Sequence, residues 1–329
     1  MRTLPTLRDF SYAALFVAFT HLVFGAIVRI SGSGMGCGDH WPLCYGHLFP
    51  PMNRPDLVVE WTHRLLASIL VLTVAAFAVV AWRVRAEPRV GGRGGVLRAV
   101  LLALAAVLAA AILGAVTVKL GNTPYATVAH WLLAMTLFAT LGAAAIRAGA
   151  MGGAAASVEH ASPRVARAAN AAAVLAFLTV ALGGLTAKLP NAAMACRSFP
   201  LCGADPDAGA RAVHVQSTHR VLAVLLLLHL IGVVTGLMRR REESRIVARA
   251  ATVALGLVIL QLTVAAAMVL LRLPPFLRSL HEAVGVSVWL GTFTYAYLAR
   301  IAAKRHPAPE PSGAVSRSGQ MTRDPLPVR

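Results

Sequence analysis

The chain has 329 residues, of which 57% are hydrophobic and 13% are charged. A soluble domain carries about 25% charged residues, so the composition excludes an ordinary water-soluble fold and predicts an all-α integral membrane protein. The formal net charge of +18 comes from short basic clusters between apolar runs, without interleaved aromatic residues. This pattern favours the Lys and Arg bias of cytoplasmic loops over a surface that binds nucleic acid.

Eight apolar runs along the chain are long enough to cross a bilayer. A helix of about 20 residues spans a hydrocarbon core of about 30 Å. The first run continues into Arg29-Ile30-Ser31-Gly32 without a small-residue cleavage site, which favours a retained helix over a signal peptide. The predicted transmembrane helices are residues 10–30, 58–82, 97–120, 125–146, 165–187, 213–238, 246–271 and 276–299.

The basic residues predict how these helices are oriented. If the N-terminus is cytoplasmic, 21 of the 31 Lys and Arg residues fall on the cytoplasmic side. This asymmetry predicts that both termini are cytoplasmic, N-in and C-in. Residues 306–329 are rich in Pro, Ser and Arg and are predicted to form a disordered cytoplasmic tail.

One five-residue motif occurs twice and divides the chain into two halves. Residues 60–64 read Glu-Trp-Thr-His-Arg, and residues 216–220 read Gln-Ser-Thr-His-Arg. Four spans in each repeat give both halves the same orientation, so the duplication is parallel. We therefore expect two pseudo-symmetric four-helix bundles, one in residues 1–150 and one in residues 151–305.

A pair of cysteines precedes each copy of the motif, Cys37 with Cys44 and Cys196 with Cys202. Their spacing allows a metal site. In the predicted topology, however, both loops face outward, and an oxidising compartment there favours a disulfide in each.

Four histidines occupy matching places in the two halves. His63 and His219 lie in the repeated motif, and His130 and His281 follow much later in each half. Two imidazoles that face each other across a four-helix bundle can bind a porphyrin iron on both axial faces. Zinc is less favoured, because no carboxylate or thiolate ligands match at that depth. The unrepeated mid-helix histidines His21 and His229 are interpreted as packing or polar contacts.

The residues around the first histidine of each pair suggest further roles. Arg64 and Arg220 follow it directly and could hold the haem propionates, although snorkelling to the membrane interface is an alternative. Glu60 lies one helical turn before His63 and could accept a proton, although a carboxylate is also favoured near a helix N-terminus. Gln216 takes the same place in the second half and cannot act as a base. The pattern therefore predicts a reactive N-terminal half and a supporting C-terminal half.

Taken together, these features resemble bacterial haem A synthase over residues 10–300. The resemblance implies a multi-pass protein of the bacterial cell membrane that oxidises the C8 methyl of haem O to a formyl group through a hydroxymethyl intermediate. His63 and His130 would hold the substrate haem, Glu60 would be the catalytic carboxylate, and His219 and His281 would hold haem b as cofactor. The Cys37–Cys44 pair would be the functionally important outer-loop disulfide, and Cys196–Cys202 the second.

The resemblance also implies partners for this enzyme. A haem O synthase would supply the substrate, an electron-transfer partner would take up electrons, and cytochrome oxidase would receive the product. Association of the chain with copies of itself is a further option. The alternative from a different class is a quinol-linked di-haem b cytochrome, but its haems usually lie on opposite membrane sides. A haem transporter without chemistry would not explain why Glu60 occurs in one half only.

Overall fold

The computed structural model describes residues 3–240 and 242–304, and its long elements are all α-helices. In each case the helix contains or closely overlaps a predicted apolar run. The predicted cytoplasmic tail, residues 306–329, lies outside the described residues. The long helices are α1 (Thr3–Ile30), α2 (Pro55–Arg83), α4 (Val96–Lys119), α5 (Pro124–Arg147), α7 (Pro163–Lys188), α8 (Ala210–Arg239), α9 (Arg245–Leu270) and α10 (Pro275–Ala303).

Local sequence explains where many of these helices begin. Proline is suited to the first helical position, because its missing N–H would be unpaired there anyway. Four of the long helices begin at a proline: Pro55, Pro124, Pro163 and Pro275. The remaining elements are short, namely α3 (Pro88–Gly91), α6 (Gly153–Ala156) and three 3₁₀ turns, η1 (Ser33–Met35), η2 (Ala192–Met194) and η3 (Pro206–Ala208).

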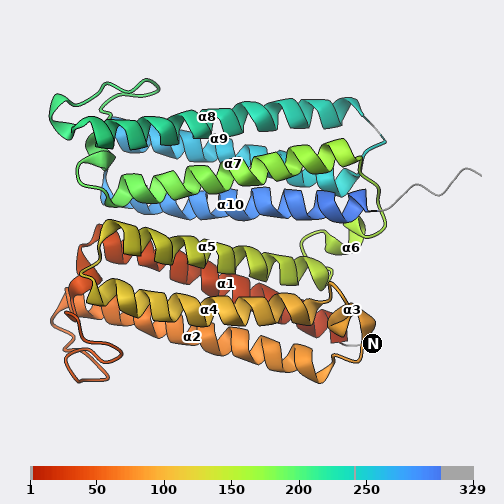
Figure 1. Ribbon diagram of the computed structural model, residues 1–329, viewed down its shortest axis with the longest axis horizontal. Coiled ribbons are helices and arrows are strands. Elements are labelled where there is room, and N and C mark those ends of the chain that lie inside the picture. The colour runs from red at the N-terminus through yellow and green to blue at the C-terminus, as the bar shows by residue number, and fades with distance from the viewer. Residues whose placement is uncertain (1–2, 241, 305–329) are drawn as a thin grey trace, which may run out of the picture.

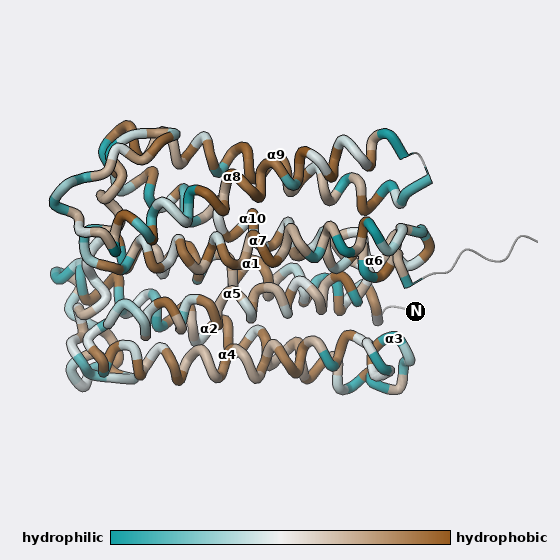
Figure 2. Tube along the Cα trace, turned by 45° about the horizontal axis from the view of Figure 1, so that its top comes forward, coloured by the Kyte–Doolittle hydropathy of each residue, from teal (hydrophilic) through white to brown (hydrophobic). Residues whose placement is uncertain are grey.

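Seven helices of the described chain, α1, α2, α4, α5, α7, α8 and α9, are long and apolar enough to cross a membrane. Figure 2 shows the apolar residues along the helices and the polar ones gathered at their ends. The protein is therefore an all-helical, multi-pass membrane protein. The eighth long helix, α10, has 29 residues and carries Arg278 and Glu282 near its beginning. That α10 also spans the membrane, and that both termini are cytoplasmic, stay predictions.

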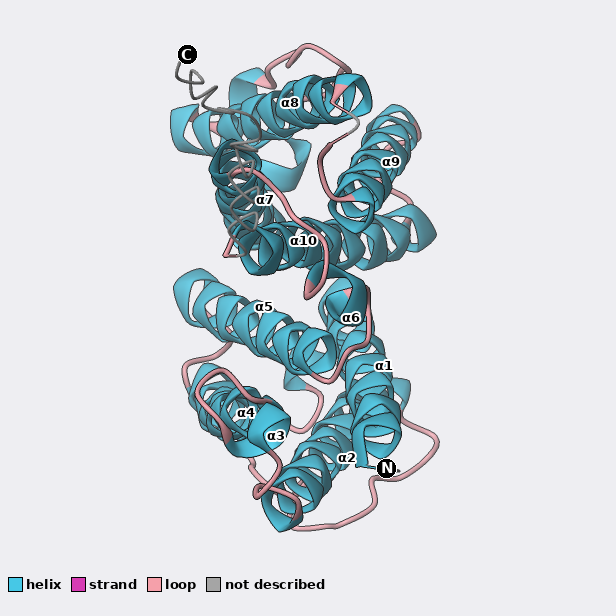
Figure 3. Ribbon diagram, turned by 90° about the vertical axis from the view of Figure 1, so that its right-hand side faces the viewer, coloured by secondary structure: helices cyan, strands magenta, loops and turns pink. Residues whose placement is uncertain are grey.

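The helices pack as two groups of four. Helices α1, α2, α4 and α5 form one group and α7 to α10 form the other, as the end-on view shows (Figure 3). The segments that carry the cysteines leave both groups at the same end of the molecule. This end lies opposite the one where α1 begins (Figure 1).

The two groups meet through α1 and α5 on one side and α7 and α10 on the other. The Trp289 indole of α10 donates a hydrogen bond to the Met135 carbonyl of α5 over 2.9 Å. Nearer the loop end, Arg29 of α1 forms an ion pair with Glu282 of α10 at 3.0 Å. A single apolar core extends through both groups, so they are joined as one body.

At the opposite end, two acidic residues accept hydrogen bonds from N–H groups at the beginnings of α7 and α9, each from the helix that follows the other residue. Glu159, just before α7, accepts hydrogen bonds from the Ser244 hydroxyl and the Ile246 N–H at the start of α9. Glu243, just before α9, accepts one from the Ser162 N–H at the start of α7. Helix N-termini leave N–H groups without intrahelical partners and favour negative charge, so each carboxylate stabilises the other segment's helix.

This arrangement predicts a pH-dependent contribution of Glu159 to stability. Partial burial opposes ionisation, but the hydrogen bonds from Ser244, Ile246 and Arg245 outweigh it and lower the pKa of the Glu159 carboxyl. Because the folded-state pKa is below the unfolded one, the contribution is complete above the unfolded pKa and disappears as the pH falls through the folded one.

We expect Glu159→Gln to cost about 1–2 kcal/mol at neutral pH, comparable to loss of a helix cap. Thermal unfolding in detergent measures this, and the difference from wild type should shrink at acidic pH. Exposed Glu242→Gln is the matched control and should leave the midpoint unchanged. An equal effect of both variants would contradict the capping role.

Candidate functional site

Both cysteine pairs form disulfides, Cys37–Cys44 and Cys196–Cys202. The two loops are built alike, since each also has a cis peptide bond before its proline, Pro42 in one and Pro200 in the other. Each loop lies against the helix that carries the repeated motif, α2 in the first half and α8 in the second.

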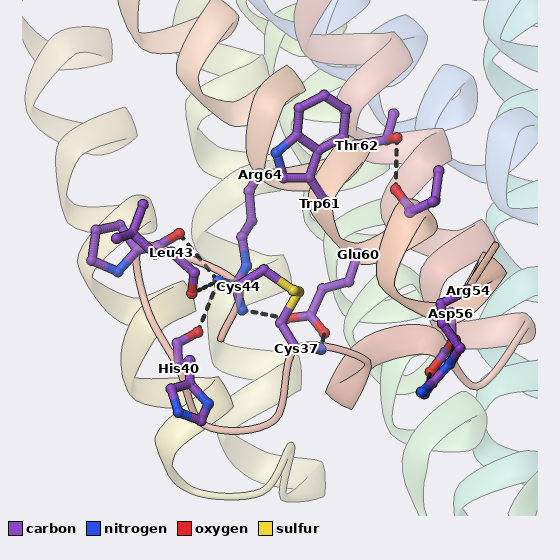
Figure 4. The surroundings of a disulfide bond; sticks show 12 residues. Cys37, His40, Leu43, Cys44, Arg54, Asp56, Glu60, Trp61, Thr62 and Arg64 are labelled. Atoms are coloured by element: carbon purple, nitrogen blue, oxygen red, sulfur yellow. Dashed lines mark hydrogen bonds and ion pairs between the residues drawn. A yellow bond between two sulfur atoms is a disulfide. The ribbon is translucent and has the colours of Figure 1, made fainter. Parts of the chain in front are cut away.

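Glu60 and Gln216 make the same contact with these loops. Oε2 of Glu60 accepts a hydrogen bond from the Cys37 N–H over 2.8 Å, and Oε1 of Gln216 accepts one from the Cys196 N–H over 2.6 Å. Both side chains are buried. The carboxylate differs in adding an ion pair to Arg64, one helical turn further on (Figure 4). The two halves therefore share a structural contact, and the first alone places a buried negative charge there.

Arg64 and Arg220 bind the loops as well. The Arg64 guanidinium donates to the carbonyls of His40, Pro42 and Leu43 over 2.8–3.2 Å. The Arg220 guanidinium binds three carbonyls of the second loop in the same manner. Loop anchoring is therefore the contact that the structure gives these arginines, in addition to the propionate role that the sequence suggests. Arg220 also lines the cavity described next.

The C-terminal bundle encloses a cavity of about 670 Å³. This volume lies within the usual range of about 300–1,000 Å³ for ligand sites. His219 of α8 and His281 of α10 both line it. Each lies in the first three turns of its helix, and both helices start at the loop end. The same cavity is bordered by Arg29 and Trp131 of the N-terminal half, so neither half builds it alone.

The hydrogen bonds of His219 suit a metal ligand, and those of His281 differ. Nδ1 of His219 lies 2.8 Å from the Thr179 carbonyl, which can only accept, so Nδ1 is the donor and Nε2 is free to bind a metal. In His281, Nδ1 is buried without a hydrogen-bond partner among the described residues. The amide nitrogen of Gln261 lies 3.3 Å from Nε2 of His281 and donates to its backbone carbonyl.

The N-terminal bundle brings three histidines together. The His63 ring stacks on that of His21, with centroids 4.4 Å apart. His130 of α5 lies in the same bundle, with its ring next to Gly114 of α4. Nε2 of His21 and Nδ1 of His130 are buried without hydrogen-bond partners in the described chain. The packing contact expected of His21 is thus made within the candidate site itself.

Glycines on the facing helices leave room for the imidazole rings. A Cβ added at Gly25 of α1 would lie 3.2 Å from Nε2 of His63, and one at Gly183 of α7 would lie 3.0 Å from the His219 ring. Gly114 of α4 makes the same allowance for His130. Larger residues at these places would displace the rings.

Charged residues surround the opening of the C-terminal cavity. Arg29 and Arg278 both border it, and Glu282 bridges to Arg29 from the residue after His281. Motif spacing did not identify Arg29, Arg278, Gln261 or Trp131. The repeat could have identified two of the lining residues, because Trp131 and Glu282 occupy equivalent positions, each directly after the second histidine of its half.

Sequence comparisons agree on one family. The family model described as cytochrome oxidase assembly protein matches residues 8–293. A haem A synthase of Shouchella clausii is 30% identical over 255 residues, which cover 76% of this chain and 82% of the relative. A haem A synthase of Geobacillus kaustophilus is 26% identical over 317 residues, covering 92% and 94%. A third, of Geobacillus thermodenitrificans, is 27% identical over 304 residues, covering 90% of each chain.

Proposed function

Because this chain belongs to the COX15-CtaA family of cytochrome oxidase assembly proteins, we propose that it is a haem A synthase. It oxidises the C8 methyl of haem O first to hydroxymethyl and then to formyl, and the product serves cytochrome oxidase. As an oxidoreductase acting on a farnesylated porphyrin, it works within the bacterial cell membrane.

The observation that carries this proposal is the C-terminal cavity with His219 and His281 on its wall. Its volume, its mainly apolar lining and its two imidazoles fit a bis-histidine haem. We assign haem b to this bundle, residues 151–305. When bound, haem b supplies one-electron redox chemistry.

The residues of this bundle have distinct roles toward the cofactor. Thr179 fixes the His219 ring through its Nδ1–H, which orients the ligand and raises its basicity. The Gln261 amide lies next to Nε2 of His281 and would have to move away if that nitrogen held the haem. Arg29 and Arg278 supply positive charge for the propionates at the opening.

The N-terminal bundle, residues 1–150, is proposed to hold the substrate haem between His63 and His130. The His21 ring stacks on that of His63 and helps to fix its orientation. Glu60 lies on the same helix face, one turn before His63, and is the group proposed to accept a proton while the methyl carbon is oxidised. Its ion pair with Arg64 holds the carboxylate in place.

We further propose that α10 completes eight spans and that both termini are cytoplasmic. The excess of Lys and Arg at the end where α1 begins supports this orientation. The disulfide loops and both haem sites then lie toward the outer face, where disulfides persist.

The direct test is product analysis. The full chain is expressed in a membrane that contains haem O, and the extracted haems are separated by chromatography and identified by mass. Haem A or its hydroxymethyl precursor is the expected product. Haem b with unchanged haem O would instead indicate the di-haem electron-transfer cytochrome and would refute the synthase.

A charge change at the cavity opening should weaken haem b binding. Arg278→Gln removes a charge-assisted contact worth about 1.5–3 kcal/mol, hence roughly 10- to 100-fold in affinity. Titration of haem into the haem-free full chain, followed by absorbance, measures the loss. Arg272→Gln is the control, because Arg272 lies exposed at the same end without bordering this cavity. Equal affinity of the Arg278 variant and wild type would show that Arg278 does not contact the propionates.

A further inference from the structure

The loop that follows the first disulfide exposes a cluster of apolar side chains. Between Asp39 and Arg54 the chain carries no Asp, Glu, Lys or Arg. The exposed large residues of this stretch are Trp41, Leu43, Tyr45, Leu48, Phe49 and Met52. Contiguous apolar surface of this kind marks an interaction site or a membrane contact.

This loop is held against α2 at several points. The Trp61 indole donates a hydrogen bond to the Leu48 carbonyl over 2.7 Å, and the Phe49 ring packs on Trp61 with centroids 5.6 Å apart. On the other side of the loop, Arg64 and the disulfide fix residues 37–44. The exposed side chains are therefore presented by an anchored segment.

Trp61 connects the loop to an apolar stripe on α2. Leu65, Ile69 and Leu72 follow it at helical spacing and are exposed along the body of this candidate span. Exposed apolar residues in the middle of a membrane span face lipid, because they have no water to face. Leu48 and Phe49 lie beside Trp61 and so add to that lipid-facing stripe near the beginning of α2.

The second half lacks this feature. Ser217 replaces Trp61 at the equivalent position, and the segment after Cys202 contains Asp205 and Asp207. In residues 195–209 of the second loop, the exposed large apolar residue is Leu201. The apolar loop is thus not a general consequence of the repeat.

We propose that residues 45–52 are inserted in the interfacial layer of the lipid bilayer beside α2, with Leu48, Phe49 and Met52 in contact with lipid. The occupant is lipid because the loop continues the lipid-facing stripe and has no Asp, Glu, Lys or Arg that would be desolvated. Aromatic and apolar side chains with backbone carbonyls nearby suit this layer, where one end of a residue is apolar and the other is wet. The inference requires only that α2 spans the membrane.

Site-directed fluorescence in nanodiscs tests this proposal. Met52→Cys and Leu48→Cys are labelled separately with an environment-sensitive dye. Met52 and Leu48 are 67% and 66% exposed in the isolated chain. The native cysteines do not react with the dye, because they are disulfide-bonded. Nitroxide on the lipid headgroups or shallow acyl carbons should quench both labels. Aqueous iodide should quench them at least about threefold less than a label at Leu201→Cys, which is 80% exposed on the second loop.

Two results would overturn the proposal. Labels at 48 and 52 that are as open to iodide as the one at 201, and insensitive to lipid nitroxide, would place the loop in water. Labels shielded from both quenchers would mean that protein, either a second copy or a partner, covers the surface. Leaving Phe49 and Trp61 unchanged preserves the loop contact, and two independent positions guard against a local disturbance at either one.

Discussion

Glu60→Gln is expected to abolish conversion of haem O while leaving haem content unchanged. The amide can keep the Cys37 N–H contact, since Gln216 makes the equivalent contact with Cys196. It cannot accept a proton, and it removes the negative charge beside Arg64. Loss of a general base costs about 10²- to 10⁴-fold in rate, so we expect product to fall at least about 100-fold. The measurement is the ratio of haem A to haem O in extracts, normalised to total haem.

The matched control is Gln216→Glu, which places a carboxylate in the second half. It should leave conversion near the wild-type rate, because the haem that is oxidised is proposed to bind in the other bundle. Normal product formation in Glu60→Gln would reject a catalytic role and leave Glu60 as a residue that holds the loop. A variant that loses haem as well would point to structural damage, and the intact disulfide, checked by mass, separates that outcome from a chemical one.

His281→Ala is expected to remove the bis-histidine haem b signal. One axial ligand is then missing, so the low-spin absorption bands should disappear. The affinity for haem b should fall at least about tenfold, because loss of even a hydrogen bond to a metal ligand lowers metal affinity 10- to 100-fold. Absorption and electron paramagnetic resonance spectra of the purified protein give the measurement. Haem O conversion should stop too, because the supporting haem is lost.

Two other histidines separate ligand loss from general damage. His229→Ala removes a helix contact to the Ala168 carbonyl outside the cavity and should keep the haem b spectrum. His63→Ala should also keep that spectrum while conversion stops, since His63 belongs to the other bundle. Survival of the low-spin bands in His281→Ala would reassign the ligand pair.

Much of the molecule followed from the sequence. The apolar runs predicted the long helices, because a helix that faces lipid must be apolar along its length whatever its neighbours are. The repeat showed that the pair His63 and His130 corresponds to the pair His219 and His281. The predicted outward loops favoured disulfides over a metal site, and the structure contains both disulfides.

Other features depended on which helices meet. Arg29 lies at the end of α1 and Glu282 on α10, 253 residues apart, and only packing of the two halves makes them an ion pair that borders the C-terminal cavity. His21 has no counterpart in the repeat, so no pattern linked it to His63. The carbonyls that engage Arg64 and Arg220 belong to irregular loops, whose path no periodicity encodes.

The sequence by itself therefore determined the helical membrane class, the duplication and the candidate ligands, because hydropathy and repeated spacing are local properties of the chain. The tertiary structure decided that Glu60 and Gln216 share one backbone contact and differ in a single buried charge. It also decided that the C-terminal cavity is completed by Arg29 and Trp131 from the other half. Contacts between distant segments arise from close packing of side-chain shapes and charges, which hydropathy does not specify.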